Sequence, residues 1–413
     1  MLSLRDPVHG FIRADPLEAA LVNSRPVQRL RFIHQLGLTF LVFPGAEHSR
    51  FSHALGAMHL AGRVYDVLCS HVASQAGGPA RGRAGVLLPG GAASRERRLV
   101  RAAALLHDLG HAPFSHSAEE LFEGGIDHEE MTRRLIATRE VAEVFARFGD
   151  GLVPADVIRL LAGGEGPTER LLAQVVSGEL DVDKMDYLLR DSLFCGVRYG
   201  SYDLDRLLDT MRPIEDPQTG AWGIGVDEGG VHALEALVMA RYYMFTQVYF
   251  NVTGKALELH LNEWLAGSGR RWPADPEAFL AEDDVTVWAE MRRSDSVHAR
   301  AVVARGHFPV AFETREHLAR HEKQAFEALL PGLRERFGAG NVLTSNSAKD
   351  PHRLGRSRVL VRRFDGALEP MAEASQFIRH LARIDRYRVY TPHSLRAEVG
   401  GALRELWPPD PKS

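Results

Sequence analysis

Apolar residues recur at helical spacing along the first two thirds of the chain. One stripe, within residues 51–72, comprises Leu55, Met58, Gly62, Tyr65 and Cys69. Residues 97–109 are almost entirely apolar after Arg98, and helical periodicity returns over 183–208 and 233–250. A stripe at this spacing predicts a helix with one face in the core, and a run that is apolar on all sides predicts a buried helix. We therefore expect this part of the chain to be mainly helical.

A segment rich in glycine and proline, 77–94, separates the first two of these helices. Its composition is incompatible with a regular element. We expect an exposed, flexible loop between helices that still pack together.

The helical character ends at a second interruption, GSGRRWPADP (267–276). The elements predicted after it are a strand over 358–364, a helix over 374–383 and a strand over 386–392. We therefore predict a mainly α protein, with a helical domain over residues 1–265 and a smaller α+β region over 266–413. A role in oligomerisation or as a scaffold is the simplest one for that second region.

Composition excludes several classes of protein. The chain has 413 residues, of which 45% are hydrophobic, so it can bury a substantial core. Its two cysteines, Cys69 and Cys195, lie far apart, which argues against a disulfide framework or a thiolate zinc site and suits a reducing cytoplasm. We predict no signal peptide and no membrane-spanning segment. The net charge of -4 does not indicate nucleic-acid binding.

A histidine and an aspartate stand at the end of the buried helix. In ALLHDLGHAPFSHS (104–117), His107 and Asp108 precede Gly110, where the helix must stop. Burying a charge without a partner costs several kcal/mol, and a bound cation would remove that cost. If only this pair is considered, an alternative to metal binding is open. His107 would contact the last carbonyls of the helix, and Asp108 would make a hydrogen bond with a nearby group.

Two further residues favour the cation. His53 lies near the start of the helix predicted at 51–72, and Asp183 lies at the start of the one predicted at 183–208, so three helices can converge on one ion. Two neutral imidazoles and two carboxylates neutralise a divalent cation and suit Mn, Fe, Co, Ni or Zn better than Ca. Four protein ligands around a six-coordinate ion leave two positions for water and substrate.

This order of H, HD and D resembles the HD superfamily of phosphohydrolases, in particular the branch of deoxynucleoside triphosphate (dNTP) triphosphohydrolases that includes the animal SAM-and-HD-domain enzymes. The shared stretches are DPVHGFI (6–12), PVQRLRFIHQLG (26–37), VFPGAEHSRFSHALG (42–56), HDLGHAPFSH (107–116), DHEE (127–130) and DVDKMDYLLRD (181–191). The resemblance implies an all-helical HD-domain core and a homo-oligomer. It also implies one divalent metal per active site, with Mn or Mg favoured for activity, held by His53, His107, Asp108 and Asp183.

The implied reaction converts a dNTP and water into a deoxynucleoside and triphosphate. Two alternatives stay open. The same metal site could serve another nucleotide, such as a monophosphate, a cyclic nucleotide or an alarmone. The chain could also be a regulator that binds a nucleotide without turning it over.

Histidines close to the HD pair suit proton transfer, because a neutral imidazole near pH 7 can give or take a proton. The resemblance implies that His128 acts with Asp127 or Glu130, and that His111 and His116 approach the phosphates. Either His111 or His128 would protonate the departing deoxynucleoside oxygen. For each histidine the alternative is a structural, hydrogen-bonded ring.

Phosphate recognition needs fixed positive charge, since one divalent ion cannot neutralise a triphosphate. Arg50 and Lys184 are the candidates, because each lies within one helical turn of a predicted metal ligand. Tyr187 and Asp191 continue the polar stripe that begins at Asp183. The alternative for this stripe is a solvated helix face with a Lys–Asp pair.

The resemblance also implies which residues would contact the sugar of the substrate. Gln35 and Asp191 would bind its 3'-hydroxyl, while Leu36 and Tyr249 would pack where a 2'-hydroxyl would lie. A ribose hydroxyl pressed against Leu36 would lose its water without gaining a partner, which costs about 1–3 kcal/mol. Leu36 could equally belong to the core.

One position departs from the family pattern. The activated animal enzymes bind guanine nucleotides with an aspartate that corresponds here to Ser24, although Gln28 and Arg31 remain. This difference argues against activation by nucleotides.

Overall fold

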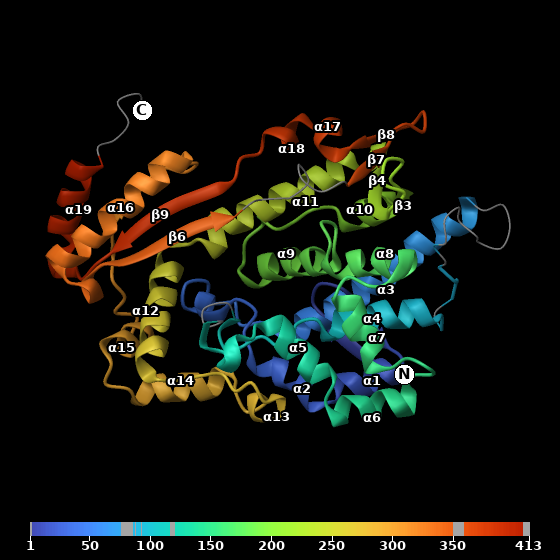
Figure 1. The fold of residues 1–413 in the computed structure, drawn as a ribbon, viewed down its shortest axis with the longest axis horizontal. Helices are drawn as coiled ribbons and strands as arrows, with labels where there is room; N and C mark the ends of the chain where they lie inside the picture. The colour runs from blue at the N-terminus through green and yellow to red at the C-terminus, as the bar shows by residue number, and fades with distance from the viewer. Residues whose placement is uncertain are drawn as a thin grey trace.

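The computed structural model describes residues 2–75, 86, 88–91, 93–115, 120–349 and 359–407. Within them the chain is mainly helical and carries small sheets, with the longest strands near the C-terminus (Figure 1). The predicted fold class is therefore confirmed. His116 and most of the loop predicted at 77–94 lie outside the described residues.

The predicted helices are present, with different ends. The helices up to residue 268 are α1 (Pro16–Val22), α2 (Arg25–Arg29), α3 (Arg50–Gln75), α4 (Arg95–Leu106), α5 (His128–Ile136), α6 (Arg139–Phe148), α7 (Pro154–Leu161), α8 (Gly166–Ser177), α9 (Val182–Phe194), α10 (Leu204–Thr210), α11 (Val231–Met244) and α12 (Val252–Ser268). The later ones are α13 (Pro276–Phe279), α14 (Asp284–Arg293), α15 (Val297–Val303), α16 (Arg320–Phe337), α17 (Met371–Ala374), α18 (Gln376–His380) and α19 (Arg396–Leu406). The single helix expected over 183–208 is divided, because Gly196 adopts a left-handed φ of 69° and ends α9.

The strands form a hairpin and two larger sheets. They are β1 (Leu2–Asp6), β2 (Gly10–Ala14), β3 (Met211–Glu215), β4 (Trp222–Asp227), β5 (Val310–Glu313), β6 (Leu343–Lys349), β7 (Leu360–Arg362), β8 (Leu368–Pro370) and β9 (Ile384–Tyr390). The sheet orders are β1-β2, β3-β4-β7-β8 and β5-β9-β6. Strand β4 pairs in parallel with β7, so chain segments on both sides of residue 265 share one sheet. The hairpins β1-β2 and β3-β4 were not predicted, because their strands are too short for a clear alternation.

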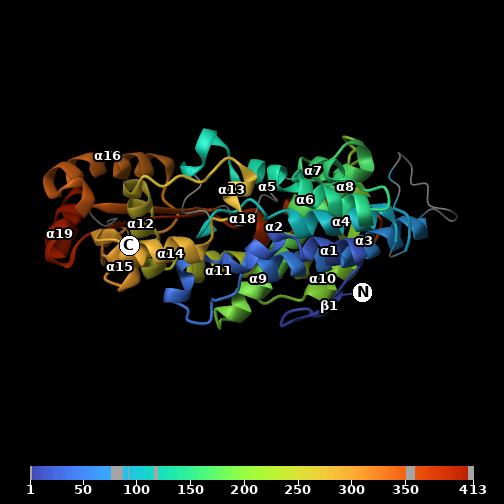
Figure 2. The same ribbon diagram turned by 90° about the horizontal axis from the view of Figure 1, so that it is seen from below.

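The C-terminal sheet has a small core of its own. Phe326, Leu330, Tyr387, Val389 and Leu403 are buried between α16, α19 and the strands β5, β9 and β6. Figures 1 and 2 show this part at the end of the molecule opposite the N-terminal hairpin. Among the helices that the structure describes, none is long and apolar enough to cross a membrane.

The long helix α3 lies at the centre of the helical part and packs against α4 and α9. Gly56, one turn after His53, permits the closest approach to α9. A Cβ atom there would lie 1.8 Å from Asp186 Oδ1 and 2.4 Å from Arg190 Nη2, which side chains could not tolerate without moving. The contact between α3 and α9 therefore requires glycine.

We predict that Gly56→Ala lowers the free energy of unfolding by about 1–3 kcal/mol, because the added methyl group overpacks a buried contact. Urea denaturation measures this change. The control is Gly267→Ala in α12, where a Cβ meets nothing within 4 Å; alanine should stabilise that helix by about 0.5–1 kcal/mol. Equal effects of the two substitutions would contradict the close-approach argument.

Candidate metal and phosphate site

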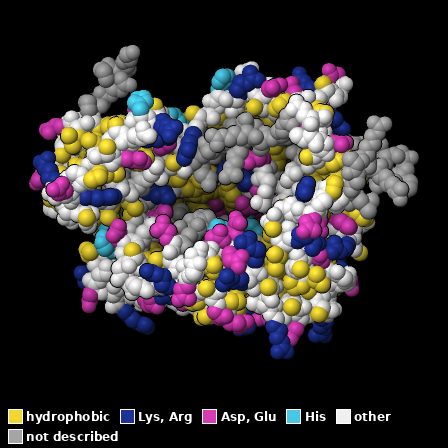
Figure 3. Space-filling model, in the orientation of Figure 1, with side chains coloured by type: hydrophobic (Ala, Val, Ile, Leu, Met, Phe, Trp, Pro, Cys, Tyr) yellow, Lys and Arg dark blue, Asp and Glu magenta, His cyan; other side chains and the backbone are white. Residues whose placement is uncertain are grey.

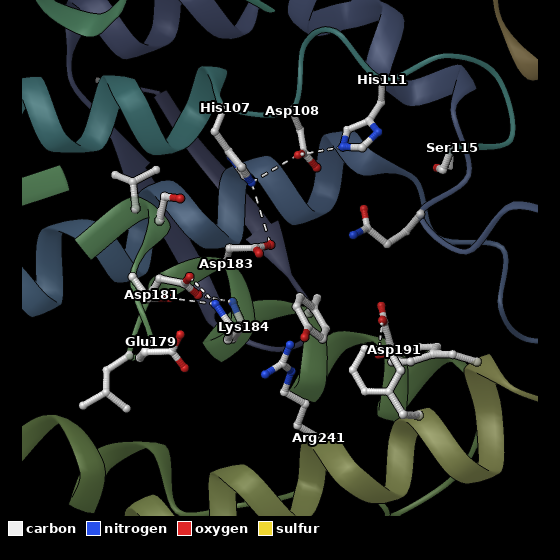
Figure 4. Close-up of a pocket in the computed structure, with 18 of the residues that line it drawn as sticks. His107, Asp108, His111, Ser115, Glu179, Asp181, Asp183, Lys184, Asp191 and Arg241 are labelled. Atoms are coloured by element: carbon white, nitrogen blue, oxygen red, sulfur yellow. Dashed lines mark hydrogen bonds and ion pairs between the residues drawn. The ribbon is translucent and has the colours of Figure 1, made fainter. Parts of the chain in front are cut away.

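Helix ends bring four acidic and imidazole side chains to one point. His53 comes from the first turn of α3, His107 and Asp108 directly follow α4, and Asp183 lies in the first turn of α9 (Figure 4 labels the last three). His53 Nε2 lies 3.1 Å from Asp183 Oδ1 and 3.8 Å from Asp108 Oδ2. His107 Nε2 lies 3.3 Å from Asp108 Oδ1 and 3.8 Å from Asp183 Oδ1. The structure thus places the four predicted metal ligands together.

The two imidazoles are oriented so that the Nε2 atoms face this point. His53 Nδ1 donates a hydrogen bond to Asp186 Oδ2 at 2.8 Å, and His107 Nδ1 donates to the Ala104 carbonyl at 2.8 Å. Both Nε2 atoms are buried, and neither makes a hydrogen bond with a described residue. Metal-binding histidines characteristically donate the other ring N–H to a carboxylate or a carbonyl. The donor set therefore fits a divalent cation, with His53, His107 and Asp108 offering ligand atoms within 4.8 Å of one another.

Asp186 organises a buried network behind His53. Its carboxylate is fully buried and accepts hydrogen bonds from His53, from His9 Nε2 at 2.7 Å and from Arg190 at 2.8 and 2.9 Å. Arg190 also donates to Asp6 Oδ2 at 2.7 Å, which links the N-terminal hairpin to α9. Sequence reasoning assigned no role to these residues. The available signal was the Asp186–Arg190 spacing of four within α9, next to Asp183.

Electrostatics at the centre favour positive charge. Burial alone would lower the pKa of His53, but the carboxylates of Asp183 and Asp186 raise it to about 10. Burial also opposes charge on His107, and Asp108 and Asp183 raise its pKa nonetheless. The pKa of Asp183 is held well below its ordinary value, because the two imidazoles outweigh its burial. A divalent cation supplies the charge that these carboxylates attract.

A cavity of about 1230 Å³ opens beside this point. Figure 3 shows the face of the molecule hollowed near its middle, with acidic and histidine side chains visible in the hollow. The predicted substrate and proton-transfer residues that line the cavity are Gln35, Leu36, Arg50, His111, His128, Lys184, Tyr187, Asp191 and Tyr249. The polar stripe expected along α9 therefore faces the cavity.

Both predicted phosphate-binding cations already hold an acidic partner. Arg50 Nη1 lies 2.5 Å from Asp108 Oδ2, and its Nε and Nη2 donate to Ser115 Oγ at 3.1 and 2.8 Å. Lys184 forms an ion pair with Asp181, the residue that caps α9. These contacts fix the two cationic groups at the cavity wall.

A third cation was missed by sequence reasoning. Arg241 lies on α11 and lines the cavity, and Figure 4 shows it reaching from that helix towards Lys184. Its segment was interpreted only as an apolar helix, since a single arginine among apolar residues carries no signal of what it faces.

The two histidines predicted for proton transfer lie together. His111 Nε2 lies 3.2 Å from Asp108 Oδ1, and the rings of His111 and His128 stack with centroids 4.5 Å apart. Both line the cavity. This pair can present an imidazole to a ligand beside the predicted metal.

The acidic residues expected to act with His128 have other partners. Asp127 caps α5 by accepting the Glu130 N–H at 2.7 Å. The Glu130 carboxylate pairs with Arg133 and Arg134, each at 2.9 Å. Neither Asp127 nor Glu130 is among the described residues that line the cavity. Their assignment to the reaction is thus not favoured by this geometry, because helix capping and surface ion pairs already occupy both carboxylates.

Asp191 is buried at the other end of the α9 stripe. It accepts hydrogen bonds from Tyr249 at 2.7 Å and from His48 Nε2 at 2.8 Å. Gln35 Oε1 lies buried near the cavity with no hydrogen-bond partner among the described residues. Leu36 is partly buried against the main core and also lines the cavity. Its position therefore agrees in part with both predictions, a core residue and a residue that faces the sugar. His48 was not singled out from the sequence.

Comparison with known proteins identifies two family models that match the chain and several relatives. Residues 50–191 match the HD domain, and residues 202–307 match the HD-associated region. The chain is 41% identical over 263 residues to the uncharacterized protein YwfO of Bacillus subtilis, covering 63% of this chain and 54% of that protein. It is 32% identical over 269 residues to the deoxynucleoside triphosphate triphosphohydrolase SAMHD1 homolog of Dictyostelium discoideum, covering 62% and 47%. The chain thus spans about half the length of these relatives.

A solved structure matches almost the whole chain. A hypothetical protein from Aquifex aeolicus superposes with a TM-score of 0.79 at 31% identity, covering 97% of this chain and 99% of that one. The likeness therefore extends through the C-terminal region that the family models leave unmatched. The chain belongs to the HD-domain family of phosphohydrolases that carry an HD-associated region.

Proposed function

We propose that this chain is a metal-dependent dNTP triphosphohydrolase, which releases a deoxynucleoside and triphosphate. The observation that carries the proposal is the pair of buried imidazole Nε2 atoms that make no hydrogen bond with the described residues and face two carboxylates, beside a cavity lined by cationic side chains. The similarity to the triphosphohydrolase of Dictyostelium discoideum supports the choice of a dNTP.

The metal would be held by His53, His107, Asp108 and Asp183. When bound, a divalent cation stabilises the negative charge of a phosphate and polarises its oxygens. Manganese or magnesium is the ion expected to support activity, as the resemblance to the dNTP triphosphohydrolases implies.

Fixed cations complete the phosphate site. Arg50 is oriented by Asp108 and Ser115, while Lys184 and Arg241 line the same cavity. Several positive groups are needed because a triphosphate carries more negative charge than one divalent ion neutralises. Their fixed positions would align the phosphates with the predicted metal ligands.

Proton transfer falls to the stacked histidines. His111 is held beside Asp108, and His128 stacks on its ring at the cavity wall. An imidazole in this position would give its proton to the deoxynucleoside oxygen as the phosphorus–oxygen bond breaks.

The sugar would lie towards Asp191. Tyr249 and His48 fix the Asp191 carboxylate, and the Gln35 carbonyl oxygen is available to accept a hydrogen bond from a sugar hydroxyl. Leu36 offers no partner to a second hydroxyl. A deoxyribose therefore suits this end of the cavity better than a ribose.

Product analysis tests the proposal. We expect the manganese-loaded protein to convert dNTPs into deoxynucleoside and tripolyphosphate, with ribonucleoside triphosphates cleaved more slowly. Chromatography with phosphorus NMR identifies both products. Release of orthophosphate or pyrophosphate would contradict the proposed cleavage position, and binding without any product would favour a regulator.

The Asp108→Ala substitution should abolish metal binding and activity, because it removes a ligand and leaves Arg50 without its acidic partner. Metal content after dialysis against Mn²⁺ measures the loss. Asp66→Ala is the control, since Asp66 lies on α3 with a half-exposed side chain that pairs only with Arg97 among the described residues. Stoichiometric metal in Asp108→Ala would count against the ligand assignment.

The Asp186→Asn substitution should weaken Mn²⁺ binding by about 10–100-fold, because the carboxylate that orients His53 is lost. Calorimetric titration measures the affinity, and circular dichroism checks the fold. His9→Ala removes only one donor to Asp186 and should have a smaller effect. Unchanged affinity in folded Asp186→Asn would show that His53 needs no such support.

A further inference from the structure

A carboxylate from the HD-associated region reaches the edge of the candidate site. Asp284 is the first residue of α14, and it is 3% exposed. Its Oδ2 accepts hydrogen bonds from the His34 backbone N–H and from His34 Nδ1, both at 2.7 Å. Its Oδ1 accepts the Phe114 backbone N–H at 2.8 Å. One carboxylate thus joins the segment before Gln35 to the loop after the HD pair.

The backbone of that loop adopts an unfavourable conformation at two consecutive residues. Phe114 and Ser115 adopt φ values of 55° and 60°, and consecutive left-handed residues that carry a Cβ atom are rare. Such conformations persist where surrounding contacts hold them, and they concentrate at functional sites. The Phe114 N–H is the group that Asp284 holds, so the carboxylate acts at the point of strain.

The strained loop in turn holds a predicted phosphate-binding cation. Ser115 Oγ receives two hydrogen bonds from Arg50, whose third contact is Asp108. The Ser115 side chain can occupy this place only while the backbone keeps its left-handed turn. A continuous path of contacts therefore runs from Asp284 through Phe114 and Ser115 to Arg50.

The start of the same loop is also tied to the HD-associated region. The buried guanidinium of Arg29 donates to the carbonyls of Leu109 at 3.3 Å, His111 at 3.0 Å and Glu282 at 2.8 Å, and it stacks on Phe279 at 4.3 Å. Segment 109–115 is therefore held at its beginning through Arg29 and at its end by Asp284.

We propose that Asp284 is a positioning residue, which holds the Phe114–Ser115 turn and through it sets Arg50 for a phosphate. The HD-associated region would then contribute to the phosphate site from α14 as well as through Arg241, although none of the described α14 residues lines the cavity. The identity of the ligand as a polyphosphate rests on the proposed function. The role of Asp284 in ordering the loop does not depend on it.

The test compares Asp284→Asn with Asp283→Asn. Both remove one negative charge near Arg29 from the start of α14, but the Asp283 carboxylate caps that helix by accepting the Thr286 N–H and makes no hydrogen bond with segment 109–115. Asparagine keeps the cap, whereas at position 284 its NH₂ group would face a donor of His34 or Phe114. We expect hydrogen exchange of segment 109–115 to accelerate in Asp284→Asn alone. Unchanged exchange in that variant would overturn the proposal.

Affinity for manganese tripolyphosphate provides the second readout. We expect Asp284→Asn to weaken binding about tenfold, since a displaced positioning group commonly costs at least that much, and Asp283→Asn to leave it unchanged. Mn²⁺ affinity should be the same in both variants. Equal tripolyphosphate affinities, or no binding by the parent protein, would refute the link to Arg50. Binding without dNTP hydrolysis would refute the proposed function only.

The Ser115→Ala substitution tests the path itself. It removes the hydroxyl that Arg50 contacts and leaves the Asp284 carboxylate intact. This variant therefore still tests the contact path if Asp284→Asn fails to fold. We expect a similar loss of tripolyphosphate affinity, and in the double variant less than the sum of the two losses. Fully additive losses would show that Asp284 does not act through Ser115.

Discussion

Buried charge in the helical core must be compensated, and the arrangement of the site follows from this constraint. Asp108, Asp183 and Asp186 meet around His53, which is fully buried. Arg190 compensates the Asp186 side, whereas the partners of Asp108 and Asp183 among the described residues are imidazoles and Arg50. A divalent cation would complete the balance on that side. The apolar packing of α3, α4 and α9 therefore places these charges where the proposed chemistry would need them.

The grouping of His53, His107, Asp108 and Asp183 could be predicted because each of them stands near a helix end that the sequence indicates. Gly110 follows the HD pair, and Asp181 caps the helix that carries Asp183. Side chains at the ends of helices that pack together meet even when they are far apart in sequence. The mainly helical fold was predictable for a similar reason, since the apolar periodicity of α3 and α4 extends over several turns.

Other features depend on contacts that no local pattern reveals. The network of His9 and Asp186 joins the N-terminal hairpin to α9; the spacing of Asp186 and Arg190 marks a pair within α9, but nothing in its own segment links His9 to that pair. Asp127 and Glu130 look like catalytic acids by position, yet capping and ion pairing engage them. Asp284 belongs to a region that the resemblance barely covered. Its contacts indicate that the HD-associated region supports the HD domain rather than standing apart from it.

Anomalous diffraction at the manganese edge, on crystals grown with Mn²⁺, tests the central claim most directly. The account predicts one strong peak per chain, within coordination distance of His53 Nε2, His107 Nε2 and the carboxylates of Asp108 and Asp183. A map without a peak among these four side chains, or with manganese bound elsewhere while they remain apart, would contradict it.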